Sequence, residues 1–101
     1  MRLLLFYDLP SVTNAEKKIY RKFNKFLEKN GFIRMQESVY TKLALNNSIA
    51  KATVDRIRAN VPTKGLIQIL VVTEKQFASI ECVCGTYKTN HIDSEKRVII
   101  L

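Results

Sequence analysis

Two short apolar segments, residues 2–8 and residues 66–73, place the strongest constraint on how this chain folds. Each is too short to be a typical helix of a globular core, and each is bounded by a turn-forming residue, Pro10 or Gly65. Both segments are therefore predicted to be buried strands. Helical periodicity recurs in two places between them, so we expect strands and helices to alternate along the chain.

The first of these helices has clear start and stop signals. Thr13 and Glu16 have the spacing of a capping box, in which each side chain accepts a hydrogen bond from the other residue's backbone amide. Asn30 with Gly31 supplies the left-handed stop at the far end. The apolar residues in between recur at helical spacing, which predicts one core-facing stripe of Ile19, Phe23, Phe26 and Leu27.

The second helix is expected to begin at Asn46 or Asn47 and to continue to about residue 60, where Pro62 helps to end it. Its predicted core stripe consists of Ala50, Val54, Ile57 and Val61. Before it, alternating apolar residues predict one long strand over residues 32–43, with a kink near Glu37. Two shorter apolar segments predict further strands at residues 80–84 and 97–101.

This order predicts a single domain over residues 1–101, an α+β sandwich of the ferredoxin-like kind with a mainly antiparallel sheet and an extra C-terminal strand. Two helices cover only one face of such a sheet, yet the predicted strands carry apolar side chains on both faces. A homodimer packed through its sheets would cover the second face, with the C-terminal strand as a natural element to exchange.

Charge is the main functional signal. The net charge is +8, and residues 1–73 hold 13 Lys and Arg against 5 Asp and Glu, whereas residues 74–101 hold 4 of each. Such a concentrated positive field favours a polyanionic partner such as nucleic acid over an anionic membrane surface. A merely solubilising surface is the alternative.

On the first predicted helix, the basic residues fall in one narrow stripe opposite the apolar side, and only Glu28 interrupts them. An ordinary solvated face would alternate the sign of its charges, so this stripe is interpreted as a phosphate-contacting ridge. We define the lysine ridge as Lys18, Lys22, Lys25 and Lys29, with Arg21 beside them. Six further cations cannot be assigned to its face from the sequence, namely Arg34, Lys42, Lys51, Arg56, Arg58 and Lys64.

Candidate catalytic residues are few. Asp8 closes the first predicted strand, a position from which side chains commonly reach a binding site, although a turn-forming aspartate is equally consistent with the pattern. His91 has no obvious partner. Cys82 and Cys84 lack the spacing of a disulfide or zinc site, so these two cysteines are interpreted as reduced structural thiols. No glycine-rich phosphate loop or nucleophilic triad is recognisable.

No apolar segment approaches the roughly 20 residues that span a bilayer, and the apolar start is too short for a signal peptide. A soluble, cytoplasmic protein without membrane contact is therefore expected.

Three tracts, in order and at fitting separations, carry a family resemblance. They are FYDLP at residues 6–10, RMQESVY at residues 34–40 and TEKQF at residues 73–77. Together with the length and the order of elements, they resemble the second, smaller protein of the CRISPR adaptation pair over essentially the whole chain. The resemblance implies a ferredoxin-like homodimer that holds protospacer double-stranded DNA, bridges integrase subunits and helps to insert new spacers.

Some members of that family are metal-dependent endonucleases acting on RNA or DNA. The resemblance then implies that Asp8 binds Mg²⁺, or another divalent cation, and is catalytic, with Arg34 contacting nucleic acid and Tyr40 supporting the site. Tyr40 stands where phenylalanine is frequent, and lysines replace helix arginines, which makes hydrolysis less secure than DNA holding. A toxin-like metal-dependent endoribonuclease with no adaptation role is the alternative, and a small RNA-binding module is disfavoured because its aromatic strand signature is absent.

Overall fold

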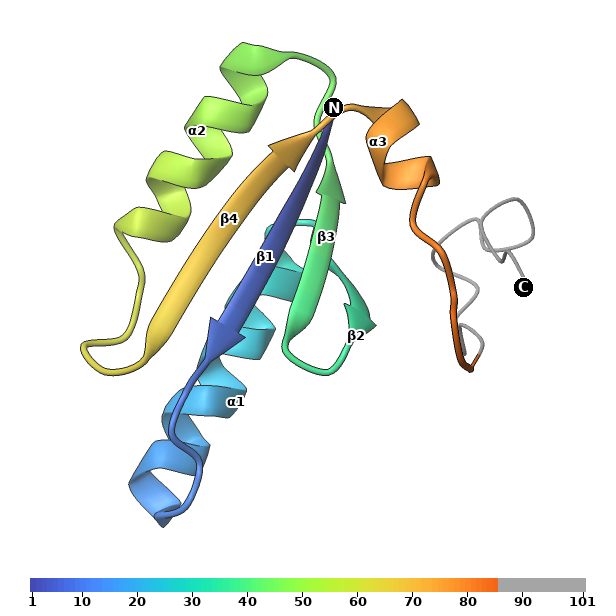
Figure 1. Cartoon of the computed structure of the whole chain (residues 1–101). Helices are drawn as coiled ribbons and strands as arrows, with labels where there is room; N and C mark the ends of the chain where they lie inside the picture. The colour runs from blue at the N-terminus through green and yellow to red at the C-terminus, as the bar shows by residue number, and fades with distance from the viewer. Residues whose placement is uncertain (86–101) are drawn as a thin grey trace.

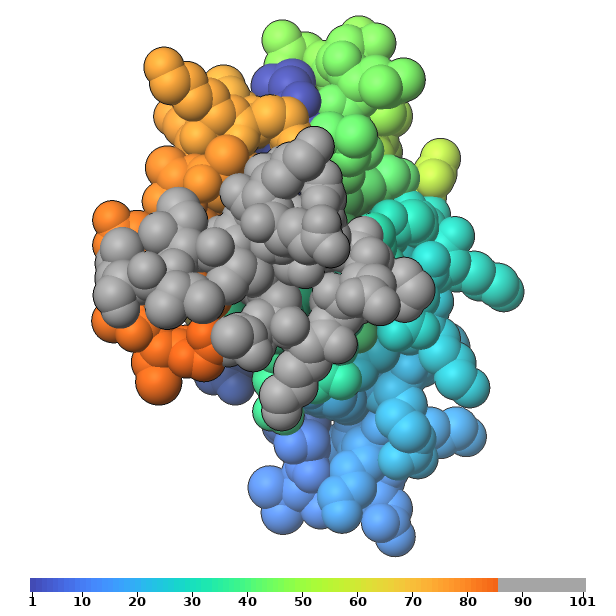
Figure 2. Space-filling view, turned by 90° about the vertical axis from the view of Figure 1, so that its right-hand side faces the viewer, coloured from blue at the N-terminus to red at the C-terminus, as the bar shows by residue number. Residues whose placement is uncertain are grey.

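The computed structural model describes residues 1–85. The elements follow in the order β1 (Arg2–Asp8), α1 (Asn14–Lys29), β2 (Ile33–Gln36), β3 (Val39–Leu43), α2 (Asn47–Arg58), β4 (Leu66–Val72) and α3 (Glu74–Ala78). The four strands form one antiparallel sheet in the order β2-β3-β1-β4. Helices α1 and α2 lie on one side of the sheet and the short α3 on the other, as the two views show (Figures 1 and 2). The predicted α+β, ferredoxin-like class is confirmed.

The core lies between β1 and the two long helices. Leu3, Leu5 and Tyr7 of β1 alternate along the strand and are all buried on the helix-covered face of the sheet. They contact Phe23 and Leu27, the two buried residues of α1. Both long helices therefore pack against the side chains of β1.

Helix α1 begins as its sequence predicts. The Thr13 hydroxyl accepts from the backbone amide of Glu16 at 3.1 Å, and the Glu16 carboxylate accepts from the Thr13 amide at 3.0 Å. The bond from the Thr13 amide, followed by one from the Val12 amide, holds the pKa of the Glu16 carboxylate below its usual value. The predicted core stripe is wrong at Ile19, which is 49% exposed, because the helix turns Tyr20 towards the core instead.

Residues 33–43 form a β-hairpin rather than the single strand predicted for residues 32–43. The chain reverses at Glu37 and Ser38, and Ser38 has a φ of 64°. The turn lacks the Asn-Gly or Gly signals typical of hairpins. A bulge between Arg34 and Gln36 shifts the pairing of the two strands by one residue. Because of this shift, odd-numbered residues on both sides of the turn lie on one face of the sheet. The alternation of residues is therefore the same for one strand as for this hairpin, and periodicity could not distinguish them.

Helix α2 begins after Asn46, whose side chain accepts from the Ile49 amide at 2.9 Å, but it ends at Arg58, two residues earlier than predicted. The predicted Ala50 and Ile57 are buried, together with the unpredicted Thr53, and the predicted Val54 packs partly buried against the core. Val61, assigned to this stripe from the sequence, lies beyond the helix and is 44% exposed.

Helix α3 was not predicted. Thr73 ends the fourth strand early and caps this helix through a second capping box with Gln76. The Arg2 guanidinium binds the Glu74 carboxylate with two hydrogen bonds of 2.7 and 2.9 Å and stacks 4.3 Å from the Phe77 ring centroid. This contact fixes α3 over one end of the face that α1 and α2 leave uncovered.

The strand predicted at residues 80–84 is reduced to a single bridge residue, Cys82. Both cysteines are free thiols as expected, but Cys84 is exposed and so is not part of the core. The strand predicted at residues 97–101 and His91 lie outside the described residues. Within the described part of the chain, no helix is long and apolar enough to cross a membrane.

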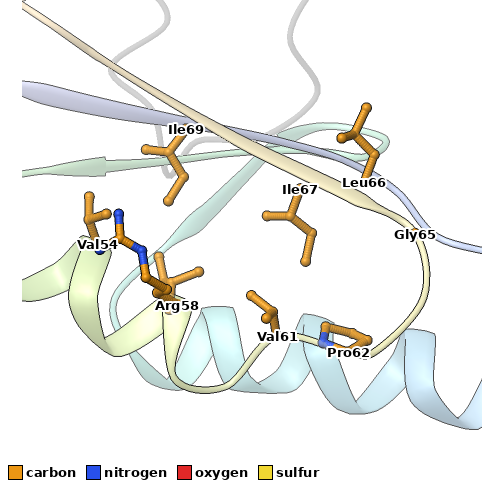
Figure 3. A pocket seen from close by; sticks show the side chains of 9 residues that line it. Val54, Arg58, Val61, Pro62, Gly65, Leu66, Ile67 and Ile69 are labelled. Atoms are coloured by element: carbon orange, nitrogen blue, oxygen red, sulfur yellow. The ribbon is translucent and has the colours of Figure 1, made fainter.

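An apolar hollow lies between the end of α2 and β4. Figure 3 shows Ile67 and Ile69 of β4 pointing into it opposite Val54, with Arg58 among the lining residues. Arg58 is 3.5 Å from Asp55 on its own helix. Arg58 is therefore turned towards the β4 side of α2.

Two buried threonines allow a matched test of polar burial. The Thr41 hydroxyl is fully buried and has no hydrogen-bond partner among the described residues, whereas the Thr53 hydroxyl donates to the Ile49 carbonyl at 2.8 Å. We expect Thr41→Val to raise the free energy of unfolding by about 1 kcal/mol, because it removes an unsatisfied polar group. Thr53→Val should lower it by about 1 kcal/mol, because it removes a hydrogen bond. Urea titration of both variants measures this, and a destabilised Thr41→Val protein would contradict the assignment.

Candidate nucleic-acid interface and metal-binding carboxylate

Asp8 is the last residue of β1 and pairs with Leu66 of β4. Its side chain is exposed. Because side chains alternate along a strand, Asp8 shares its side of the sheet with Phe6 and lies on the face opposite α1 and α2. The carboxylate therefore stands at one end of the face that those two helices do not cover.

The backbone on either side of Asp8 is firmly anchored. Tyr7 and Leu9 are both buried, and the Tyr7 amide donates to the Ser38 carbonyl at 3.1 Å. The Tyr7 hydroxyl donates to the Asn24 side-chain oxygen at 2.5 Å. Burial, followed by a hydrogen bond with Tyr20, raises the pKa of Tyr7 far above its usual value, so the phenol stays protonated and keeps this bond.

A third anchor comes from Gly65, which the sequence identified only as the residue before the strand. Gly65 has a φ of +102°, and a Cβ atom there would lie 2.6 Å from the Leu9 Cδ2 atom and 2.7 Å from the Asp8 carbonyl oxygen. Only glycine allows this close approach. The loop before β4 thus fixes the turn that follows Asp8.

The structure of one chain does not bring Asp8 together with the two residues implied to support it. Tyr40 pairs with Leu5, faces the helices and is 1% exposed. Burial and then the Glu28 carboxylate raise the pKa of Tyr40, with the Arg34 guanidinium opposing them, so Tyr40 is neutral. Arg34 pairs with Tyr40 and lies on the same side of the sheet, where it is exposed. The functional roles of both stay predictions.

The donor set for a metal ion is small. Within residues 1–85 no group of three or more His, Cys, Asp or Glu side chains is placed to hold a metal. Asp8 offers an exposed carboxylate oxygen at the end of β1, which suits a hard cation such as Mg²⁺. An octahedral ion would take its other ligands from water, phosphate or the Asp8 of a second copy.

The lysine ridge is confirmed as a single surface. Phe23 and Leu27 define the buried side of α1, and the five cations of the ridge lie on the other side, all exposed. None of them takes part in either ion pair found in the described part of the chain, Arg2 with Glu74 and Arg58 with Asp55. Their charges are therefore available to a ligand.

The ridge and Asp8 face different ways. Asp8 lies on the sheet face opposite α1, whereas the ridge is on the side of α1 away from the core. The later turns of α1 lie behind the strands, and its first turns extend past the end of β1 (Figure 1). Asn24, the polar partner of Tyr7, was missed from the sequence, because the Tyr7 hydroxyl reaches it only through the tertiary fold.

Comparison with known proteins gives one consistent result. A family model described as CRISPR associated protein Cas2 matches residues 1–80. The chain is 42% identical to the CRISPR-associated endoribonuclease Cas2 of Treponema denticola over 101 residues, 100% of both proteins. It is 48% identical to a protein of that name from Streptococcus mutans serotype c over 101 residues, 100% of this chain and 93% of the relative. A Ligilactobacillus salivarius protein of that name is 42% identical over 100% of both chains.

The close contact of Gly65 with the Asp8–Leu9 turn can be tested separately from the strain of its positive φ. Gly85 also has a positive φ, of +85°, but a Cβ atom there would meet nothing within 4 Å. We expect Gly85→Ala to cost about 1–2 kcal/mol through left-handed strain alone. Gly65→Ala should cost more and should shift the NMR amide signals of Asp8 and Leu9, because the new methyl group pushes that turn away. Equal costs, with unmoved signals, would show that Gly65 does not position Asp8.

Proposed function

Because this chain belongs to the CRISPR associated protein Cas2 family, we propose that it acts in CRISPR adaptation. In this proposal it is a basic homodimer in the cytoplasm that holds protospacer double-stranded DNA and bridges integrase subunits. The observation that carries the DNA-holding role is the lysine ridge, five exposed cations on one side of α1 without ion-pair partners among the described residues. A protein that neutralises phosphates in this way releases counterions, which favours binding without sequence preference.

The homodimer is supported by the apolar residues on the second face of the sheet. Phe6, Leu66 and Leu70 are 37%, 56% and 51% exposed and share that face by strand alternation. Within the described residues, β4 is a seven-residue edge strand without a bulge, whereas the other edge, β2, has four residues and a bulge beside it. An unprotected edge and an apolar face together suit pairing with a second copy of the chain.

A second activity is favoured by the relatives, which are named endoribonucleases. In this proposal Asp8 holds Mg²⁺, which when bound activates water and stabilises charge on the phosphodiester. The chain's own contribution is to present the carboxylate on a strand end that Tyr7, Leu9 and Gly65 hold rigidly. Two copies of Asp8 near a dimer axis would add a second carboxylate. An endoribonuclease with no adaptation role is the alternative proposal, and RNA is then the substrate.

The ridge is tested by reversing its charge. We expect replacement of Lys18, Lys22 and Lys25 by Glu to weaken binding of a DNA duplex and to flatten the dependence of log K on log salt by up to about 0.9 per lost contact. The measurement is fluorescence anisotropy over a salt series. A control with Lys51, Arg58 and Lys75 replaced by Glu has the same net charge change, placed on α2 and α3. An identical effect in both proteins would exclude a specific ridge.

The two activities are separated at Asp8. Asp8→Asn should abolish Mg²⁺-dependent cleavage of RNA or DNA, because an amide is a poor ligand for magnesium. Without metal it should leave the dimer equally stable or slightly more stable, because it removes repulsion between two carboxylates. Duplex binding and spacer integration with the partner integrase should persist, since the ridge is intact.

Glu37→Gln is the matched control, because Glu37 is an exposed carboxylate in the β2–β3 turn. It should retain both cleavage and integration. Loss of integration by an Asp8→Asn protein whose sedimentation and melting temperature match the wild type would show that Asp8 serves adaptation itself. The proposed division of roles would then be wrong.

A further inference from the structure

We infer that Arg56 of α2, held by Asn30, forms a phosphate-binding site with Lys29 at the C-terminal end of the lysine ridge. The DNA backbone contacts then continue from α1 onto α2. This inference rests on the proposed DNA-holding function and names where the phosphate path leaves α1. The sequence did not assign Arg56 to any surface.

The site is organised by the Asn30 side chain, which caps α1. Its Nδ2 atom donates to the Phe26 carbonyl at 2.8 Å, and this bond fixes the orientation of the amide. The Oδ1 atom is thereby directed to accept a hydrogen bond from Arg56 Nη1 at 3.1 Å. Asn30 directly follows Lys29 in the sequence, so the guanidinium is held at the C-terminal end of α1, one residue beyond the last cation of the ridge.

Arg56 has the capacity to bind a phosphate in this position. Its side chain is exposed, and it takes part in neither of the two ion pairs found within residues 1–85. The guanidinium has five N–H donors, and the bond to Asn30 uses one, which leaves a fork for two phosphate oxygens. The nearby acid on α2, Asp55, is bound to Arg58.

The negative end of the α1 dipole would by itself repel a phosphate. Lys42 counters this, because its ammonium donates to the Asn30 carbonyl at 2.7 Å. Lys29 and Arg56 add two further cations around the same helix end, against the exposed acids Glu28 and Asp55, and Asp55 is paired with Arg58. The junction is therefore net positive, and an extended phosphodiester backbone can follow it without crossing an acidic region.

Arg58 provides an internal control for Arg56. Both are exposed arginines in the last turn of α2. Arg58 is paired with Asp55 and lines the hollow beside β4 (Figure 3), whereas Arg56 contacts the end of α1. The variants Arg56→Gln and Arg58→Gln lose the same charge from the same helix but on different sides.

The experiment measures the affinity of the full chain for a labelled DNA duplex over a salt series. We expect Arg56→Gln to bind several-fold more weakly and to lose about 0.9 from the salt slope, the amount for one phosphate contact. Arg58→Gln should keep the wild-type slope. Arg56→Lys should keep the slope but bind more weakly, because lysine retains the charge and loses the fork. Melting temperatures check that each variant is folded.

An unchanged slope in folded Arg56→Gln, or an equal loss in Arg58→Gln, would overturn the site. If Arg56→Gln instead weakened only the binding of the integrase, the junction would take an acidic protein surface, and the inference would also be wrong. The triple-lysine variant distinguishes these failures from failure of the proposed function. A wild-type salt slope in the triple-lysine variant would mean that the ridge does not hold DNA. A flattened salt slope would mean that the ridge does hold DNA and that only the Arg56 site is wrong.

Discussion

The rest of the structure depends on β1, which is paired with a strand on both edges and buries its alternate side chains in the core. This strand pairs with β3 on one side and β4 on the other, so its register fixes both neighbours. A slip of one residue would move Leu5 and Tyr7 out of the core and is therefore strongly disfavoured. Asp8 is thus placed by the burial of Tyr7 and Leu9 around it. The Asp8 side chain is exposed and takes part in neither of the ion pairs found among residues 1–85.

The same layering separates the charges of the molecule. The lysine ridge lies on the side of α1 away from the core, whereas Asp8 lies on the sheet face opposite the helix layer. A duplex along the ridge would leave the opposite face of the sheet accessible. That face could then pair with a second copy while DNA is bound, so the two proposed surfaces would not compete.

The sequence predicted best what local physics determines. The capping box at Thr13 and the common face of the ridge depend only on residues within a few helical turns, and both are confirmed. The hairpin at residues 33–43 was missed because its bulge preserves the alternation of a single strand. The anchors of Asp8 were missed for another reason: Gly65 and Asn24 meet the β1 end only through the tertiary fold.

Helix α3 depends on one local capping signal, and its presence changes which part of the second sheet face is covered. Thr73 and Gln76 repeat the capping pattern of Thr13 and Glu16, but the apolar segment before Thr73 favoured a longer strand.

The helix matters because Glu74 binds Arg2, which is 72 positions away in sequence, at the start of β1. It therefore covers the second face of the sheet at the end where β1 begins. Phe6 and Leu66 remain exposed towards the other end, beside Asp8. A second copy that buried those two residues would consequently bring its own Asp8 close to this one, so the unequal cover of this face would link the proposed dimer to the proposed two-carboxylate metal site.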